Sequence, residues 1–269
     1  MTRSAHDLLD FTGRHVFVAG GSSGINLGIA AAFAQRGACV SIASRSPERV
    51  AAAVEQLRSH GGKAQGHSAD VREYDAIDTA LAAAHERFGP IDVLVSGAAG
   101  NFVAPALGMS SKGFRTVVEI DLIGSFNVLR AGHAYLRRPG ASVISISAPQ
   151  AHNPTPYQAH VCAAKAGVDM LTRVLAMEWG PDGVRVNAIM PGPIGDTEGV
   201  RRLAPTGEAL ARMTASVPLG RLGSTTEVAD MALVLSSPLA RFVTGAVIPV
   251  DGGSSLLGGR DLSAAVQAA

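Results

Sequence analysis

The segment from Arg14 to Ala34 limits the possible folds of this chain more than any other part of the sequence. It opens with a short apolar run at 15–19 and continues with apolar residues at helical spacing, which predicts a strand, a tight turn and a helix. The turn consists of Gly20, Gly21, Ser22, Ser23 and Gly24. Small side chains let a ligand approach the backbone, and the N–H groups at a helix start attract phosphate. We therefore predict that the turn binds the pyrophosphate of a dinucleotide; the alternative is a plain connecting loop.

Apolar runs and helical patterns alternate along the rest of the chain. Further strands are expected at 39–43, 63–67, 91–95, 141–147, 184–190 and 244–250, with helices at 47–59, 73–88, 110–137, 157–179 and 226–236. The stretch 110–137 is expected to be interrupted near Asp121 and Gly124. This alternation is typical of an α/β, Rossmann-like, doubly wound parallel sheet, here of seven strands flanked by helices. We expect a single domain over 1–269, with a core at about 10–255 and a tail at 256–269.

The composition argues against several classes of function. The net charge of the 269 residues is only +1, which gives no electrostatic basis for binding nucleic acid or an anionic membrane surface. No apolar run approaches a membrane span and the first twelve residues lack a signal-peptide core, so we expect a cytoplasmic protein. Cys39 and Cys162 lie in apolar elements and predict buried thiols, with neither a disulfide nor a metal site.

The end of the second predicted strand indicates which dinucleotide binds. Folds that prefer NAD place an acid there for the ribose hydroxyls, whereas NADP requires a cation for the 2′-phosphate. The residues here are Ser44, Arg45 and Ser46, with no acid before Glu48. Because a guanidinium can form two parallel hydrogen bonds with a phosphate, Arg45 indicates NADP(H). The alternative is an ordinary surface arginine at the start of a helix.

Two segments resemble motifs of the short-chain dehydrogenase/reductase family. Residues 19–25 resemble its TGxxxGxG turn, and residues 96–101 match its NNAG element, with Ser96 in place of the first asparagine. Asn26 stands where the family usually has its third glycine. Since an asparagine tolerates unusual backbone angles and can donate to a phosphate, we expect dinucleotide binding to persist.

The family resemblance also implies where the cofactor lies. Asp70 corresponds to an aspartate that receives the adenine amino group, and a helix cap is an equally simple explanation of it. The implied cofactor-binding residues are Gly20, Ser22, Ser23, Gly24, Ile25, Asn26, Ser44, Arg45, Asp70, Val71, Ala98, Ala99, Gly100, Lys165, Pro191, Gly192 and Ile194.

Family members that reduce ketones use a serine, a tyrosine and a lysine, and only the lysine has a counterpart here. Lys165 occupies its place, but Val161 stands at the tyrosine position and Ala148 at the serine position, next to Ser147. On a regular helix, neither His160 nor Tyr157 projects beside the lysine, so we expect neither to donate the proton.

Asp121 is the most informative departure from the family pattern, which usually has an asparagine at this position. A carboxylate here can pair with the Lys165 ammonium, whereas an isolated buried charge would be costly. The alternative is an aspartate that interrupts the helix and bonds to the backbone.

Four segments resemble the 2,4-dienoyl-CoA reductase branch of the family, in its peroxisomal type: 98–102, 119–127, 158–165 and 191–199. The resemblance implies NADPH-dependent reduction of a 2,4-dienoyl-CoA. Hydride would enter at C5, negative charge would spread to the thioester oxygen, and a proton would then reach Cα.

The same resemblance assigns roles to the candidate catalytic residues. Lys165 would bind the ribose and organise the proton path, with Asp121 as its electrostatic partner and water as the proton carrier. Asn101 and Ser147 are the expected polar contacts of the thioester. Residues 191–215 would form a substrate lid, in which Arg201 and Arg202 either meet CoA phosphates or remain solvated. A homotetramer is also expected.

Two other functions stay open at the level of sequence. One is an NADP(H)-dependent carbonyl reductase or alcohol dehydrogenase with an improvised acid; the other is a catalytically inactive NADP-binding scaffold. The chain ends in Gln267, Ala268 and Ala269, without the peroxisomal tripeptide, which agrees with the expectation of a cytoplasmic protein.

Overall fold

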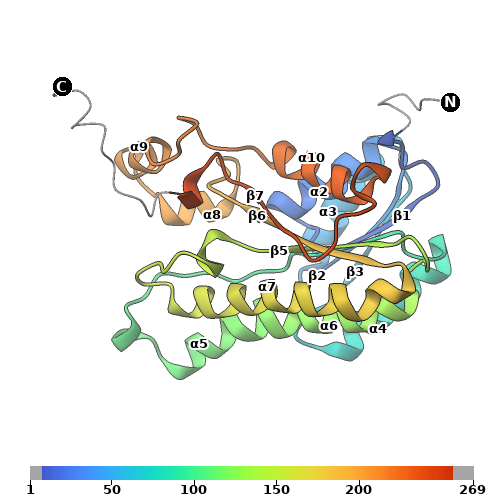
Figure 1. The fold of residues 1–269 in the computed structure, drawn as a ribbon, viewed down its shortest axis with the longest axis horizontal. Coiled ribbons are helices and arrows are strands. Elements are labelled where there is room, and N and C mark those ends of the chain that lie inside the picture. Colours follow the sequence, from blue (N-terminus) through green and yellow to red (C-terminus); the bar gives the residue numbers. More distant parts are fainter. Residues whose placement is uncertain (1–7, 257–269) are drawn as a thin grey trace.

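A computed structural model describes residues 8–256 of the chain. Seven parallel strands form one sheet in the order β3-β2-β1-β4-β5-β6-β7, which confirms the predicted doubly wound architecture (Figure 1). The strands are β1 His15–Ala19, β2 Cys39–Ser44, β3 Ala64–Ser68, β4 Val93–Ser96, β5 Ser142–Ile146, β6 Arg185–Pro191 and β7 Val247–Val250. Residues 267–269, which lack the peroxisomal tripeptide, and nearly all of the predicted tail lie outside the described residues.

Helices cover both faces of the sheet. On one face lie α2 Gly24–Gln35, α3 Pro47–Arg58 and α10 Thr225–Ser236; on the other lie α4 Tyr74–Phe88, α6 Gly124–Gly132 and α7 Ala159–Trp179, with α5 Ser111–Val118 packed along α7 (Figure 1). Each face has its own apolar core. Alternate residues of β1 supply the two cores, because Val16 and Val18 point to the α2 side whereas Phe17 and Ala19 point to the other.

The structure corrects several predicted boundaries. The stretch predicted as helix at 110–137 consists of α5, a π-helical turn at Glu119–Ile123 and α6, so the interruption expected near Asp121 is real. The helix predicted from residue 157 begins at Ala159, because Tyr157 adopts the left-handed conformation with φ of 66°. The last strand is shorter than predicted, since the chain bends at Gly245, which has a φ of 71°, and β7 begins only at Val247.

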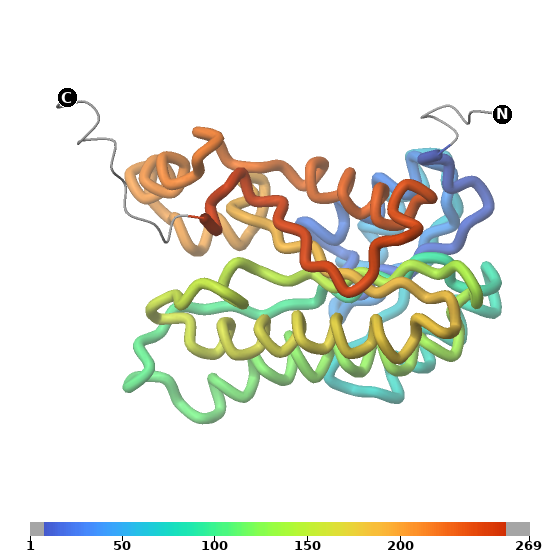
Figure 2. The backbone as a smooth tube through the Cα atoms, in the orientation of Figure 1, coloured from blue at the N-terminus to red at the C-terminus, as the bar shows by residue number. Residues whose placement is uncertain are grey.

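The carboxyl ends of the strands all lie at one edge of the parallel sheet. The predicted lid contributes two short helices there, α8 Glu198–Leu203 and α9 Gly207–Ala215, which follow β6. Figure 2 shows α8 and α9, in orange, at the same end of the molecule as the green segment that follows β4. The fold therefore places the candidate residues of the sequence at one edge.

Candidate active site

The glycine turn after β1 is shaped by close contacts with its neighbours. Gly20 has a φ of +80°, and a Cβ built on it would lie 2.8 Å from the backbone nitrogen of Ala98. A Cβ on Gly21 would lie 2.7 Å from a methyl group of Ile42. Ser23 precedes α2 without a side-chain capping bond. A side-chain-free cradle at the start of a helix fits a dinucleotide pyrophosphate.

Asn26 has a structural contact that sequence reasoning missed. It lies in the first turn of α2 and its φ is not in the left-handed region, so it does not use the unusual backbone angles that an asparagine tolerates. Its amide nitrogen donates a hydrogen bond to the carbonyl of Gly97 at 2.7 Å, so one of its donors serves the protein rather than a phosphate. The bond joins the first turn of α2 to the turn after β4. A contact of Asn26 with the cofactor stays a prediction.

The end of β2 and the loop after β3 come together beside the glycine turn. The Ser22 hydroxyl donates to the Ser44 hydroxyl at 2.8 Å. Arg45 is exposed and close enough to Asp70 to lower the pKa of that carboxyl, although the hydrogen bond from Arg72 lowers it more. These residues surround the place where the adenosine half of the cofactor is expected.

Asp70 does not cap a helix, so that alternative is wrong. It forms an ion pair with Arg72 at 2.6 Å, whereas α4 begins four residues later, at Tyr74, with Glu73 as its N-cap. Asn127 on α6 stabilises this loop, because its buried amide donates to the carbonyls of Val71 and Arg72 at 2.9 and 3.2 Å. Asn127 is a supporting residue that sequence reasoning missed; its polar side chain within the apolar α6 was the available signal.

The predicted pair of Lys165 and Asp121 forms in the structure. The ammonium nitrogen lies 3.4 Å from Asp121 Oδ2, and the two side chains are 6% and 1% exposed. The ammonium also donates to the carbonyl of Ile146, at the end of β5, at 2.9 Å. Both interpretations of Asp121 hold, because its Oδ1 accepts a hydrogen bond from the backbone N–H of Gly100 at 2.7 Å.

Asp121 reaches the lysine because it sits on the π-helical turn between α5 and α6. Such turns widen a helix by one residue and occur at functional sites. Gly100 lies directly against this turn, since a Cβ on it would be 3.1 Å from Ile120. The loop after β4, the π-helical turn and α7 therefore meet at one buried ion pair.

The groups predicted to contact a thioester have different surroundings. The Ser147 hydroxyl is buried and has no hydrogen-bond partner within the described residues. The Asn101 side chain accepts a hydrogen bond from Gln158 at 3.1 Å. The Ser147 hydroxyl and the amide N–H groups of Asn101, whose oxygen alone is used by Gln158, are therefore the donors in this region.

The structure agrees with the absence of a conventional proton donor. Val161 is buried at the tyrosine position. His160 is fully buried, with its ring 4.3 Å from that of Phe102, and its pKa is lowered because burial disfavours the imidazolium. Tyr157 is 59% exposed and precedes α7. Neither forms a bond with Lys165 within the described part of the chain.

The residues of the predicted lid make packing contacts and ion pairs within the chain. Pro191 ends β6, Gly192 packs against Asp251, and Ile194 is buried. In α8, the guanidiniums of Arg201 and Arg202 lie 3.0 and 3.1 Å from Glu198 and are exposed.

Other features of residues 8–256 add little to this site. They contain no helix long and apolar enough to cross a membrane, and no cluster of His, Cys, Asp or Glu suited to a metal ion. Cys39 and Cys162 are free cysteines, as predicted, but their side chains are half-buried rather than buried.

Comparison with known proteins agrees with the geometry. The family model described as enoyl-(acyl carrier protein) reductase matches residues 19–255. The chain is 44% identical to the peroxisomal 2,4-dienoyl-CoA reductases [(3E)-enoyl-CoA-producing] of Pongo abelii and Rattus norvegicus. The first alignment covers 89% of this chain and 83% of the relative, and the second 88% and 82%.

A solved short-chain type dehydrogenase/reductase from Mycobacterium ulcerans superimposes with a TM-score of 0.88 at 34% identity, covering 96% of each chain. Oxidoreductases of this kind use a nicotinamide dinucleotide, which the glycine cradle fits. The chain belongs to the short-chain dehydrogenase/reductase family.

Proposed function

We propose that this protein reduces 2,4-dienoyl-CoA thioesters with NADPH and forms 3-enoyl-CoA products. The observation that carries the proposal is a buried Lys165–Asp121 pair beside Val161, a position that has no proton to give. Reduction of a ketone requires protonation of a localised alkoxide, whereas reduction of a dienoyl thioester spreads charge over a conjugated system. The names of the 44% identical relatives, which specify a (3E)-enoyl product, support it.

The roles of the residues follow from their contacts. Bound NADPH supplies a hydride for C5 of the acyl chain. Lys165 has three donors, of which one serves the Ile146 carbonyl and one points to Asp121; the third remains for the ribose or for water. Asp121 balances the charge of the ammonium. A water held by Lys165 delivers the proton to Cα.

Stabilisation of the developing charge falls to the polar groups near the ends of β4 and β5. The unpartnered Ser147 hydroxyl donates to the thioester oxygen, and this bond strengthens as negative charge develops there. Asn101, held by Gln158, lies on the neighbouring loop and contacts the same thioester.

The central experiment compares NADPH consumption, followed at its absorbance maximum, with a 2,4-dienoyl-CoA, a 2-enoyl-CoA and a 3-oxoacyl-CoA. We expect turnover of the dienoyl substrate and, by proton NMR, a product with its double bond between C3 and C4. Preferred turnover of the 3-oxoacyl substrate would favour a carbonyl reductase. Tight NADPH binding without turnover of any of the three would favour an inactive scaffold.

Arg45 supports NADPH as the cofactor, because it directly follows β2, where a cation is expected to bind the 2′-phosphate. Its guanidinium is exposed and near Asp70. Arg45→Ser is expected to weaken NADPH binding about tenfold and leave NADH binding unchanged, since one charge-assisted contact to the 2′-phosphate is lost. Arg49→Ser, at an exposed position of α3, is the matched control. Equal losses for both cofactors would contradict this role.

We further propose a homotetramer in the cytoplasm. Assembly is supported by exposed apolar side chains on α6 and α7, namely Phe126, Met170, Val174 and Met177. The relatives named above are peroxisomal, so the cytoplasmic location rests on the sequence alone and is tested by imaging the tagged full chain in cells.

A further inference from the structure

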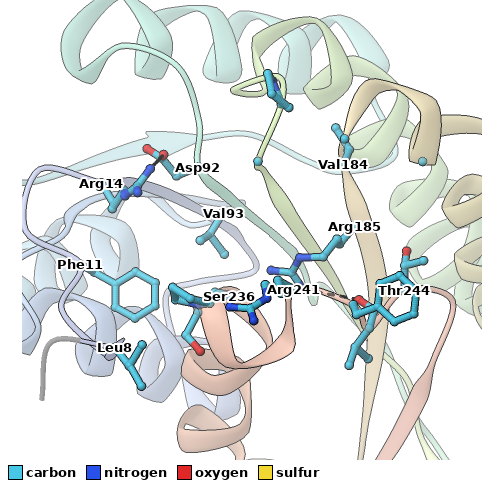
Figure 3. Close-up of a pocket in the computed structure, with 18 of the residues that line it drawn as sticks. Leu8, Phe11, Arg14, Asp92, Val93, Val184, Arg185, Ser236, Arg241 and Thr244 are labelled. Atoms are coloured by element: carbon cyan, nitrogen blue, oxygen red, sulfur yellow. Dashed lines mark hydrogen bonds and ion pairs between the residues drawn. The ribbon is translucent and has the colours of Figure 1, made fainter. Parts of the chain in front are cut away.

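A cavity of about 650 Å³ lies at the amino edge of the sheet, and none of its lining residues belongs to the proposed active site. Figure 3 shows the residues that line it. Its walls come from the starts of several strands, with Arg14 before β1, Asp92 before β4, Arg185 at the start of β6 and Thr244 before β7. This volume is within the range of small-molecule sites. The proposed reaction does not use this cavity.

At Asp92, the positive charges of the neighbouring side chains outnumber the negative charge of the carboxylate. This buried carboxylate accepts hydrogen bonds from Arg14 at 2.8 Å, Arg137 at 2.6 Å and the backbone N–H of His15 at 2.9 Å. Two guanidiniums therefore share one carboxylate, and this group keeps a net positive charge. Its acceptor oxygens are already engaged and do not serve other cations.

Arg185 and Arg241 add two guanidiniums that line the same cavity (Figure 3). Within residues 8–256, neither forms an ion pair with a carboxylate. Arg185 is half-buried, its guanidinium has a single hydrogen bond, to the carbonyl of Val243 at 3.5 Å, and burial lowers its pKa. A partly desolvated cation without a counter-charge is stabilised when an anion binds.

The remaining polar and apolar walls narrow the class of ligand. Asp10 adds a second carboxylate to the lining, and one of its oxygens accepts a hydrogen bond from the N–H of Thr12 at 2.9 Å. The three lining guanidiniums, of Arg14, Arg185 and Arg241, still outnumber the two lining carboxylates. The Ser236 hydroxyl is buried and has no partner among the described residues. Phe11 and Val184 are apolar walls, and the Phe242 ring is fully exposed. The cavity thus offers cationic donors, one free hydroxyl and an apolar surface.

We propose that this cavity binds a small organic anion whose phosphate or carboxylate group lies between Arg185 and Arg241, with an apolar body against Phe242. Both oxyanions accept paired hydrogen bonds from guanidiniums, so the chemistry is shared by the two sources. The volume is larger than an inorganic phosphate requires, which is why the ligand has an apolar part.

Isothermal titration calorimetry with phenyl phosphate, benzoate and inorganic phosphate tests the proposal. The full chain is first saturated with NADPH, so that no probe binds at the glycine turn. We expect phenyl phosphate or benzoate to bind at least tenfold more tightly than inorganic phosphate, and the stronger of the two identifies the oxyanion. Arg241→Gln, at an exposed position, and Arg185→Gln should each weaken binding at least tenfold. Arg49→Gln, on exposed α3, should leave it unchanged.

The proposal would be overturned if neither organic probe bound at a concentration on the order of 10 mM, which corresponds to the weakest useful affinities. It would also be overturned if binding of the organic probes were unchanged in Arg241→Gln. The third contrary outcome is inorganic phosphate that binds as tightly as the organic probes. Unchanged NADPH affinity shows that each variant is folded. Should Arg185→Gln not fold, Arg241→Glu at the exposed position replaces it and should abolish binding.

Discussion

Among single residues, Asp121 and Lys165 show how a buried charge can be kept on an apolar helix. The ammonium gains a carboxylate at 3.4 Å and a backbone carbonyl at 2.9 Å, and the carboxylate gains the N–H of Gly100. Each charged group therefore has a specific partner that offsets its loss of water. Removing one partner leaves the other uncompensated.

Asp121→Asn keeps the shape of the side chain but removes its charge, so it should lower kcat with a dienoyl-CoA about 100-fold, within the range for proton-transfer catalysis. Lys165→Met should have a similar effect, and the double variant should be no worse than either single one, because the two residues act as a unit. Steady-state kinetics measures all three. Lys112→Met, exposed on α5, is the control. Full dienoyl activity in Asp121→Asn would refute the mechanism.

Among the elements, α10 shows how capping residues at the start of one helix can support the cofactor turn, which is distant in sequence. Ser224 and Glu227 form a reciprocal capping box at its start. The helix packs against α2 so closely that a Cβ on Gly28 would lie 2.8 Å from Thr225. The start of α10 therefore supports the helix that follows the glycine turn.

Ser224→Ala should lower the free energy of unfolding by about 1 kcal/mol, because one N–H of the first turn loses its acceptor. Thr206→Ala removes the equivalent cap of α9, which buries no side chain, and should cost less. Urea denaturation measures both. Equal losses would mean that packing on α2 does not matter.

Glu227 gives the same cap a dependence on pH. Its hydrogen bonds with Arg221 and Ser224 lower its pKa from 4.5 to about 2. A lowered pKa means that the contribution to stability is complete above pH 4.5 and is lost as the pH falls toward 2. The difference in unfolding free energy between wild type and Glu227→Gln should therefore disappear on acidification. The group is exposed, so the difference is small. A difference that is unchanged near pH 2 would contradict this account.

For the whole molecule, the cofactor site depends on contacts between turns that are distant in sequence. The turns after β1 and β4 meet because these strands are neighbours in the sheet. A Cβ on Gly97 would lie 2.1 Å from the amide oxygen of Asn26. The glycine at 97 is therefore required by its contact with another strand's turn.

Gly97→Ala should lower the free energy of unfolding by about 1–3 kcal/mol, as expected for overpacking. Adding Asn26→Ala removes the clashing atoms and should recover part of this loss, which a double-variant cycle detects. Gly207→Ala is the control, since nothing lies within 4 Å of its added Cβ. Strict additivity would exclude the contact.

The exposed apolar face of α6 and α7 leads to a prediction about assembly. Sedimentation velocity should give a tetramer for the full chain, and Met177→Glu, at a side chain that is 81% exposed, should shift it toward smaller species because a buried charge is costly. Arg49→Glu, at an exposed position of α3 on the opposite face of the sheet, separates a general effect of charge from a local one. A monomer in the wild-type protein would exclude the tetramer.

The sequence by itself determined the sheet, its strands and the identity of the charged pair. Local patterns suffice for the sheet and its strands, because strand and helix periods and the glycine turn depend on adjacent residues. The identities of Asp121 and Lys165 came instead from the family resemblance. The pairing of Asp121 with Lys165 was inferred from the cost of an isolated buried charge, and the structure confirmed it.

Only the tertiary structure decided how the turns and loops hold one another. The π-helical turn that aims Asp121, the bond from Asn26 to Gly97, and the support of the Val71 loop by Asn127 join residues far apart in the chain. The left-handed conformation of Tyr157 belongs to the same class, as do Arg185 and Arg241, which have no carboxylate partner among residues 8–256. Such contacts depend on which elements become neighbours, and no local periodicity encodes that.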